Sequence, residues 1–208
     1  MHLSLDGSYT LNGISFQRGS DLTVSSKTGT LMVYYEGMAL DAGKKLVFQR
    51  HALTEEKENG IRFSGFYELH PGDLHVSMQN GMLQAILHAP VEEYLLGVVP
   101  YEMSNSFPVE ALKAQAVAAR TYALRKAGSS GDYDVVDNTN DQAYMGIKAE
   151  NEQAAQAVLE TKGICGVYKG KMAECYYSAS NGGQTELAKH VWGRENFDYL
   201  QMYDDPYD

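Results

Sequence analysis

The chain has 208 residues, of which 44% are hydrophobic and 21% are charged, and its mean hydropathy is −0.36. This composition is typical of globular proteins and excludes disordered, collagen-like and membrane-bundle classes. The 27 acidic side chains outnumber the 17 basic ones, giving a net charge of −10, and no run is rich in Lys and Arg. Binding to nucleic acid or to an anionic membrane needs a basic patch, so neither partner is expected.

The two ends of the chain indicate a part of a longer protein. No apolar run reaches the roughly 18 residues that a membrane-spanning helix needs. The first residues, MHLSLDGSYTL, lack the charged and then apolar pattern of a signal peptide. The last residues, MYDDPYD, form a turn-like sequence. We therefore expect a mature or excised region whose natural chain continues beyond Asp208.

The first part of the chain carries the signals of short β-strands. Alternating or apolar runs occur at residues 8–11, 31–35, 45–48, 73–78 and 82–87. Asn12-Gly13 and Asn80-Gly81 each border such runs, and Asn-Gly is the strongest short signal of a β-hairpin. We predict a β-rich N-terminal region of antiparallel strands over residues 1–88.

At Pro90 the pattern changes from strands to helices. Residues 90–96 predict a short helix that opens on proline. A long helix rich in alanine is predicted to start near Pro108 and to end at Gly128, because strong helix formers run through the whole segment. A further helix is predicted over roughly residues 150–161.

Both cysteines lie in the segment ICGVYKGKMAECYY, which predicts two strands around a Lys-Gly-Lys turn. With a three-residue loop at Lys169–Lys171, Tyr168 faces Met172. Cys165 then faces Cys175 at a separation that suits a disulfide. A slip of one residue removes this pairing and leaves two half-buried free thiols as the alternative.

The order of these elements favours an α+β fold over a doubly wound sheet. We expect a strand-rich N-terminal part over residues 1–88. A second region over residues 89–208 is expected to hold the helical segment with its long alanine-rich helix and the C-terminal β-hairpin.

Glu102 is the carboxylate that local chemistry singles out. Its neighbours in VVPYEM are largely apolar. A carboxylic acid that stays protonated in a partly apolar cleft can donate a proton to a leaving oxygen. The alternative is a glutamate that precedes the long helix and interacts favourably with its dipole. Dinucleotide, P-loop, zinc-protease and nucleophile-elbow motifs are absent from the sequence.

Three further features suit either ligand binding or packing. Gln115 and Arg120 interrupt the alanine-rich helix, and an arginine beside buried positions needs a carboxylate partner or a ligand. Residues 178–185 are small and polar, which suits a ligand-binding loop or a tight turn. The 15 tyrosines can stack on sugar rings or pack in the core.

Three segments carry a resemblance to a known family. The segment VVPYEMSNSFPVEALKAQAVAARTYALRKAG resembles the hallmark of the SpoIID/LytB family, the stage II sporulation proteins D and amidase enhancers of bacterial cell walls. Residues 137–144 (DNTNDQAY) are similar to the family's D-x-T-x-x-Q-x-Y cluster. Residues 177–185 (YSASNGGQT) are similar to its S-x-S-x-G-G-x-T segment. Together the segments span about residues 90–192.

The resemblance implies a peptidoglycan lytic transglycosylase that acts outside the cytoplasm at the cell wall, in sporulation or wall remodelling. Such an enzyme cuts between N-acetylmuramic acid and N-acetylglucosamine without water and leaves 1,6-anhydro ends. Its substrate is glycan strands, in sporulation members strands stripped of stem peptides. The Glu of the family's P-x-E-M element falls on Glu102, which is therefore expected to be the catalytic acid and base.

The resemblance also selects residues that orient the glycan or Glu102. These substrate-binding candidates are Gln115, Arg120, Gln142, Tyr144, Tyr177, Ser178 and Ser180. Some sporulation members bind zinc through Cys and His in or beside the D-x-T cluster. Here Asn140 and Asp141 occupy the variable positions, and Val136 precedes Asp137. We therefore expect no zinc and no other cofactor.

Two other functions compete with the enzyme. A non-catalytic peptidoglycan-binding module would stimulate a cell-wall amidase, as the name of the amidase enhancers suggests. A structural scaffold would dock sporulation partners. A membrane anchor, if one exists, lies outside this chain, and no nucleic-acid partner is expected.

Overall fold

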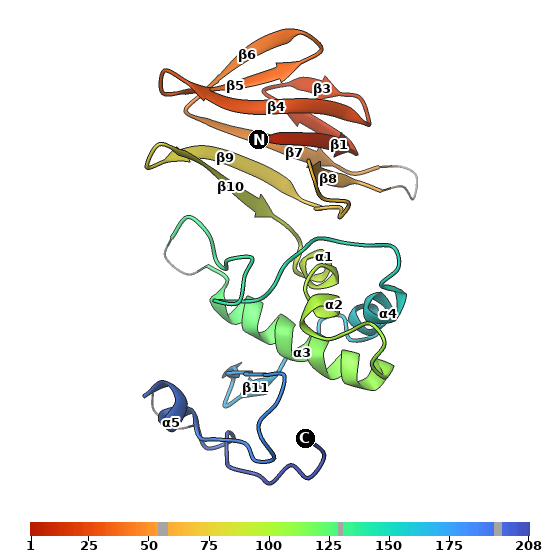
Figure 1. Ribbon diagram of the computed structural model, residues 1–208, viewed down its shortest axis with the longest axis vertical. Coiled ribbons are helices and arrows are strands. Elements are labelled where there is room, and N and C mark those ends of the chain that lie inside the picture. Colours follow the sequence, from red (N-terminus) through yellow and green to blue (C-terminus); the bar gives the residue numbers. More distant parts are fainter. Residues whose placement is uncertain (54–57, 129–130, 194–196) are drawn as a thin grey trace. The chain divides into compact units, whose positions relative to one another are not determined.

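The computed structural model describes residues 1–53, 58–128, 131–193 and 197–208. It divides into two compact units, Met1–Cys175 and Tyr176–Asp208, and each is described by itself (Figure 1). The first unit contains a strand-rich part followed by helices, so the α+β prediction is confirmed. The predicted division between residues 88 and 89 stays a prediction.

Ten strands build the N-terminal part of the first unit. They are β1 (His2–Asp6), β2 (Ser8–Leu11), β3 (Ile14–Phe16), β4 (Ser20–Lys27), β5 (Thr30–Tyr35), β6 (Met38–Gly43), β7 (Lys45–His51), β8 (Gly60–Phe63), β9 (Asp73–Gln79) and β10 (Met82–His88). They form two antiparallel sheets with the orders β6-β5-β4-β1-β8 and β10-β9-β7-β2-β3. Buried side chains of both sheets share one apolar core.

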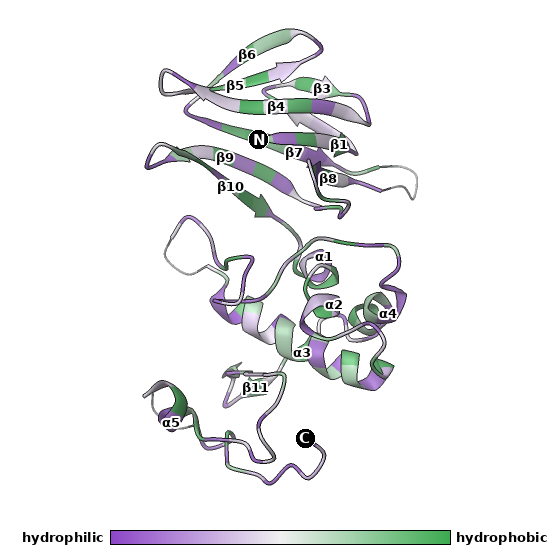
Figure 2. Cartoon of the chain, viewed as in Figure 1, coloured by the Kyte–Doolittle hydropathy of each residue, from purple (hydrophilic) through white to green (hydrophobic). Residues whose placement is uncertain are grey.

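Alternating side chains explain how the two sheets pack. In β1, Leu3 and Leu5 are buried, whereas His2 and Ser4 lie on the other face. Figure 2 shows the corresponding change between hydrophobic and hydrophilic colours along the strands. The predicted hairpin turns at Asn12-Gly13 and Asn80-Gly81 are present, with positive φ at both residues of each turn.

Four helices follow in the same unit. They are α1 (Val91–Leu96), α2 (Val99–Glu102), α3 (Val109–Lys126) and α4 (Glu152–Glu160). The short helix after Pro90, the long alanine-rich helix and the helix near residue 150 are as predicted, whereas α2 was not predicted. Apolar side chains from all four helices form a second core, in which the alanines of α3 let α4 pack closely. No described helix is long and apolar enough to cross a membrane.

Specific contacts join the strands to the helical segment within the first unit. The backbones of Leu69 and Ile147 exchange hydrogen bonds of 3.0 and 2.8 Å. Arg50 on β7 forms a 2.7 Å ion pair with Glu93 on α1. The first contact holds the loop that follows α3 beside the strand-rich part, and the second holds α1 there.

The C-terminal hairpin has a different register from the expected one. Strands β11 (Val167–Tyr168) and β12 (Lys171–Met172) are joined by a two-residue turn, so Tyr168 faces Lys171. Both turn residues have positive φ, 48° at Lys169 and 76° at Gly170, which is the two-residue hairpin geometry that matches strand twist. The prediction of a three-residue loop was therefore wrong.

The new register moves the two cysteines out of alignment. Gly166 accepts a 2.9 Å hydrogen bond from the backbone of Ala173, so Cys165 lies level with Glu174 rather than with Cys175. Both cysteines are free thiols and half-buried. This is the alternative that a one-residue slip allowed.

The second unit has little regular structure. Its described residues contain one short helix, α5 (Ala188–Trp192), and an isolated antiparallel bridge between Gln184 and Asp204. The rings of Tyr176 and Trp192 pack with their centroids 4.3 Å apart.

Candidate active site

Glu102 is the last residue of α2 and is half-buried. The preceding residues Val98 and Val99 have no exposed surface and pack in the helical core. Met103 then turns to an extended conformation, which ends the helix. The apolar sequence before Glu102 thus anchors the helix, while its polar end carries the carboxylate at the edge of the core.

A backbone group from a distant segment holds the Glu102 carboxylate. The N–H of Ala143 donates a 2.6 Å hydrogen bond to Oε1 of Glu102. Ala143 lies in the D-x-T-x-x-Q-x-Y cluster, 41 residues further along the chain. The contact brings two of the three sequence motifs together. No other partner of the carboxylate is found in the described part of the chain.

Gln142, directly before Ala143, is completely buried. Its Oε1 accepts a 3.1 Å hydrogen bond from the hydroxyl of Tyr94, and its Nε2 donates a 3.3 Å hydrogen bond to the carbonyl of Ala119. The side chain therefore ties the loop to α1 and α3. In this geometry Gln142 positions the neighbouring Ala143 N–H and has no surface with which to contact a glycan.

Tyr144 is packed behind the same loop. Its ring stacks on Tyr94, with centroids 5.3 Å apart and planes 11° apart. A β-carbon at Gly97 would lie 2.5 Å from the Tyr144 ring, so this position requires glycine. Burial raises the pKa of the Tyr144 phenol well above its ordinary value. Tyr144 thus remains neutral and supports the loop from inside.

Arg120 on α3 has 0% of its surface exposed. Its Nη2 and Nε pair with the Glu92 carboxylate at 2.7 and 3.0 Å. Further hydrogen bonds reach the carbonyls of Val158 and Ile164 at 3.2 and 3.1 Å. The guanidinium is a structural link between α1, α3 and the end of α4, and this geometry offers no direct contact to a glycan.

The pKa of Glu92 reflects this pairing. Removal of the carboxylate from water raises its pKa, but the hydrogen bonds from Arg120 and from the Gly163 N–H outweigh that effect. The net pKa lies below the ordinary value. Glu92 therefore stays ionised and satisfies the buried arginine.

Gln115 lies on α3, five residues before Arg120, and is 7% exposed. Its Nε2 has no hydrogen-bond partner among the described residues. A buried amide that lacks a partner costs free energy, so its donor capacity is unused, and the nitrogen itself has almost no exposed surface in this structure. Its contact with a glycan stays a prediction.

Asp141, which lies within the D-x-T-x-x-Q-x-Y cluster, is bound to α3. Asp141 accepts a 2.7 Å hydrogen bond from the Tyr122 hydroxyl and pairs with Lys126. Its carboxylate also accepts the Val136 N–H at 2.8 Å. Desolvation raises the pKa of Asp141, but the contacts with Lys126 and Tyr122 more than compensate and lower it overall. Asp141 therefore fixes the loop as an ionised group.

The remaining candidates, Tyr177, Ser178 and Ser180, belong to the second unit. Ser178 donates a 3.0 Å hydrogen bond to the carbonyl of Ser180. One carboxylate oxygen of Asp208 accepts hydrogen bonds from the Ser180 hydroxyl and from successive backbone N–H groups, those of Asn181, Gly182 and Gly183. The Gly-rich segment therefore forms a tight turn around the exposed Asp208 carboxylate. The part of Tyr177, Ser178 and Ser180 in substrate binding stays a prediction.

Sequence reasoning missed the group that holds Glu102, the Ala143 N–H, and a residue that supports the loop of Ala143, Tyr94. The Ala143 amide has no side-chain signature, because every residue except proline offers a backbone N–H. Tyr94 had a signal, since it lies on the proline-initiated helix just before Gly97. Its partner Gln142 is 48 residues away, so the sequence alone gave no reason to join them.

Comparison with known proteins gives a consistent result. The profile of the family described as "SpoIID: Stage II sporulation protein" matches residues 79–168. An uncharacterized protein of Brachyspira hyodysenteriae is 33% identical over 194 residues, which cover 89% of this chain and 52% of that protein. The match thus includes most of the strand-rich part.

Two relatives from Bacillus subtilis carry functional names. Its amidase enhancer is 47% identical over 98 residues, covering 47% of this chain and 13% of the relative. Its stage II sporulation protein D is 32% identical over 144 residues, covering 60% of this chain and 41% of the relative. The chain thus spans about half or less of the length of these relatives. The region of residues 79–168, which includes Glu102, Gln142 and Tyr144, is therefore a SpoIID-family region.

Proposed function

We propose that this protein is a peptidoglycan lytic transglycosylase with Glu102 as its general acid and base. The observation that carries the proposal is the 2.6 Å hydrogen bond from the Ala143 N–H to Oε1 of Glu102. It fixes one carboxylate oxygen, while Oε2 has no partner in the described part of the chain. A carboxyl group with one oxygen fixed and the other open is suited to proton transfer.

The reaction needs only one carboxyl group. Protonated Glu102 donates its proton to the glycosidic oxygen while the bond between that oxygen and C1 of muramic acid breaks. Positive charge develops on C1 and the ring oxygen, as in other glycan cleavages. The C6 hydroxyl of the same sugar then attacks C1, and ionised Glu102 accepts its proton. The products are a 1,6-anhydro end and a free hydroxyl end, with no water consumed.

The Ala143 N–H supports the second half of this cycle. A hydrogen bond from a backbone amide stabilises a carboxylate more than a carboxylic acid. It therefore stabilises Glu102 after the proton has been donated and keeps the group in place for the return transfer. Because the nucleophile belongs to the substrate, a second carboxylate for activating water is not required.

The other candidates have supporting roles in this proposal. Gln142 and Tyr144 position the loop that carries Ala143, and Arg120 holds the helices together. Gln115, Tyr177, Ser178 and Ser180 are proposed to contact the glycan. The substrate is a glycan strand, stripped of stem peptides in a sporulation setting, and the site of action is the cell wall outside the cytoplasm.

A second function is favoured by one specific observation. The relative with 47% identity is named an amidase enhancer, and its similarity covers 47% of this chain. A non-catalytic module that binds peptidoglycan and stimulates a cell-wall amidase is therefore the alternative. Both functions use the wall as ligand, so product chemistry decides between them.

The test is mass spectrometry of intact and peptide-stripped peptidoglycan after incubation with the protein. We expect anhydro-muramic ends from the wild type, and a loss of at least about a hundredfold in Glu102→Gln, because general acid catalysis contributes that much. Glu152→Gln, at an exposed glutamate on α4, is the matched control and should keep full activity.

Other products would overturn the proposal. Reducing ends would mean hydrolysis with a second carboxylate. A folded wild type that releases no sugar but accelerates a purified wall amidase would establish the alternative.

A further inference from the structure

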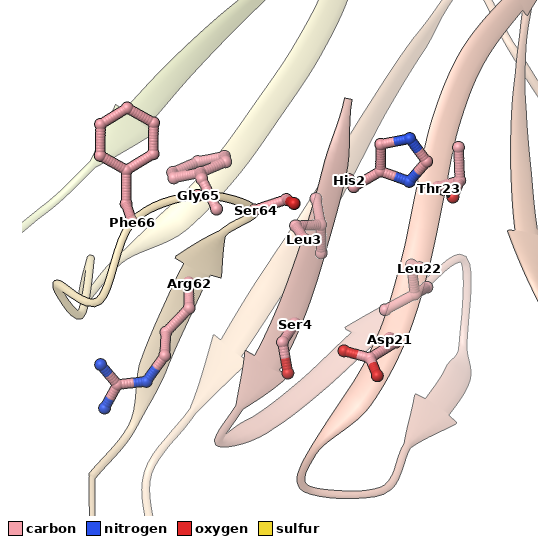
Figure 3. A pocket seen from close by; sticks show the side chains of 11 residues that line it. His2, Leu3, Ser4, Asp21, Leu22, Thr23, Arg62, Ser64, Gly65 and Phe66 are labelled. Carbon is pink, nitrogen blue, oxygen red and sulfur yellow. Dashed lines mark hydrogen bonds between the residues drawn. The ribbon is translucent and has the colours of Figure 1, made fainter.

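A groove of about 440 Å³ opens on the strand-rich part, on the sheet β6-β5-β4-β1-β8 (Figure 3). Its lining comes from β1, from β4, and from β8 with the turn that follows it. The side chains that matter here are those of His2, Ser4, Asp21, Thr23, Arg62 and Phe66. All of them lie outside residues 79–168, the part matched by the family profile.

The strand register places these side chains together on the outer face. His2 on β1 lies opposite Thr23 on β4. Ser4 lies opposite Asp21 on β4 and opposite Arg62 on β8. Directly opposed side chains on one face lie about 5 Å apart, so the polar groups form a continuous patch across three strands.

Two of these polar groups are available to a ligand. Asp21 and Ser4 make no side-chain hydrogen bond or ion pair with any described residue. Arg62 is already paired with Asp6 at 2.6 Å and with Glu58 at 2.8 Å, and its guanidinium points away from Ser4 in Figure 3. Asp21 is therefore the charge of the lining that no described side chain balances, whereas Asp6 and Glu58 balance the charge of Arg62. This charge disfavours an anionic ligand and suits an uncharged one rich in hydroxyl groups.

An aromatic ring borders the patch. Phe66 is 55% exposed, and the next residue, Tyr67, is 87% exposed. The turn that carries Phe66 is fixed, because the Ser64 N–H bonds to the His2 carbonyl and the Phe66 N–H bonds to the Phe63 carbonyl, both at 3.0 Å. An exposed aromatic side chain on such a turn, next to polar groups, can pack against the apolar face of a sugar ring.

We propose that this groove binds uncharged N-acetylglucosamine units of a glycan strand. Phe66 packs against one sugar ring, and Asp21 and Ser4, on the other side of the groove, bond hydroxyl and amide groups of another. The choice of this particular sugar rests on the proposed function, whereas the preference for an uncharged ring rests on the groove. Muramic acid that has lost its peptide carries a carboxylate and is disfavoured by Asp21. The strand-rich part would thus hold the strand independently of Glu102.

The test measures binding of chitotetraose, an oligomer of N-acetylglucosamine alone, to the full chain by calorimetry. Phe66→Ala and Asp21→Ala should each weaken this binding on the order of tenfold, through the lost ring contact and the lost charged acceptor. Met82→Ala, which truncates an exposed apolar side chain on β10 in the other sheet, should leave the affinity unchanged. Thermal unfolding verifies that all variants are folded.

The outcomes separate this proposal from the catalytic one. Wild-type affinity in Phe66→Ala and Asp21→Ala, or no binding by the wild type, would overturn the sugar site whatever the enzyme assay gives. Selective loss in these two variants would support the site even if no anhydro products form. A preference for a carboxylate-bearing sugar over chitotetraose would contradict the electrostatic basis of the proposal.

Discussion

Gly97 has a steric reason to be glycine. Its φ of −95° is open to any residue, but an added β-carbon would lie 2.5 and 2.9 Å from two atoms of the Tyr144 ring and 3.1 Å from the Gly146 nitrogen. The ring cannot move away easily, because its other side stacks on Tyr94. The close approach of α1 to the loop of residues 137–146 thus depends on a missing side chain.

Gly97→Ala should lower the free energy of unfolding by about 1–3 kcal/mol, the usual cost of overpacking. If the loop shifts, the Ala143 N–H also leaves Glu102 and turnover falls. Urea unfolding and the anhydro-product assay measure the two effects. Gly131→Ala is the control, because its β-carbon would meet nothing closer than 3.6 Å. Equal stability of the two variants would contradict the steric role.

Arg120 is a second residue whose role is structural. Arg120→Leu leaves Glu92 and the carbonyls of Val158 and Ile164 without their donor. We expect a loss of about 3–5 kcal/mol, typical of removing one partner of a buried ion pair.

Chemical denaturation of Arg120→Leu tests this prediction. Lys113→Met removes surface pairs with Glu110 and Glu160 and should have a much smaller effect. A stable Arg120→Leu variant with weakened glycan binding would instead indicate that Arg120 contacts the glycan.

At the scale of elements, local signals were sufficient where one or two residues decide the geometry. Asn80-Gly81 predicts a hairpin because both residues accept positive φ, and α3 follows from a continuous run of helix formers. α2 escaped prediction because its four residues are too few for a periodic pattern. The turn at Lys169-Gly170 was predicted to have three residues but has two, because strand signals in the sequence do not define the residue at which a strand ends.

That one-residue difference has a chemical consequence for the cysteines. Because Cys165 is level with Glu174, we expect two free thiols in the folded protein under air. Alkylation under non-reducing denaturing conditions, followed by mass spectrometry, should label both cysteines. Burial raises the pKa of the Cys175 thiol, so its labelling in the native state should be slower than that of a model thiol. An intact mass lower by two hydrogens would mean a disulfide and a different register.

At the scale of the whole molecule, the candidate site is a product of long-range contacts. The resemblance to a known family identified Glu102 and Gln142 as candidates. The sequence contains no physical signal that the segments of these two residues lie close together. Glu92, the partner of Arg120, is 28 residues away on another helix. Pairing of this kind depends on how helices pack, which local patterns do not encode.

Ionised carboxylates with lowered pKa values should also make the fold sensitive to acid. The pKa of Glu92 lies below 4.5 and that of Asp141 below 3.8. Their stabilisation is complete above these ordinary values, because the unfolded chain is then ionised too. It is lost as the pH falls from these values through the lower folded pKa values, because the unfolded chain takes up protons there before the native groups do. Burial also lowers the pKa of His70, so stability should begin to fall already below about 6.5.

Denaturant midpoints measured from neutral pH down to about pH 3 test this expectation. Asp141→Asn should be less stable than the wild type at neutral pH but should lose less stability in the acid range. A parallel decline of wild type and variant would contradict a role of Asp141 in acid unfolding.

The bond from Ala143 to Glu102 has a consequence for mutational tolerance. Its donor belongs to the main chain, so replacing the Ala143 side chain leaves the N–H in place. Proline alone among the amino acids lacks that hydrogen. A saturation library at position 143 would therefore accept small residues and exclude proline. A residue in contact with the proposed catalytic group would then look unimportant in any survey that samples side chains only.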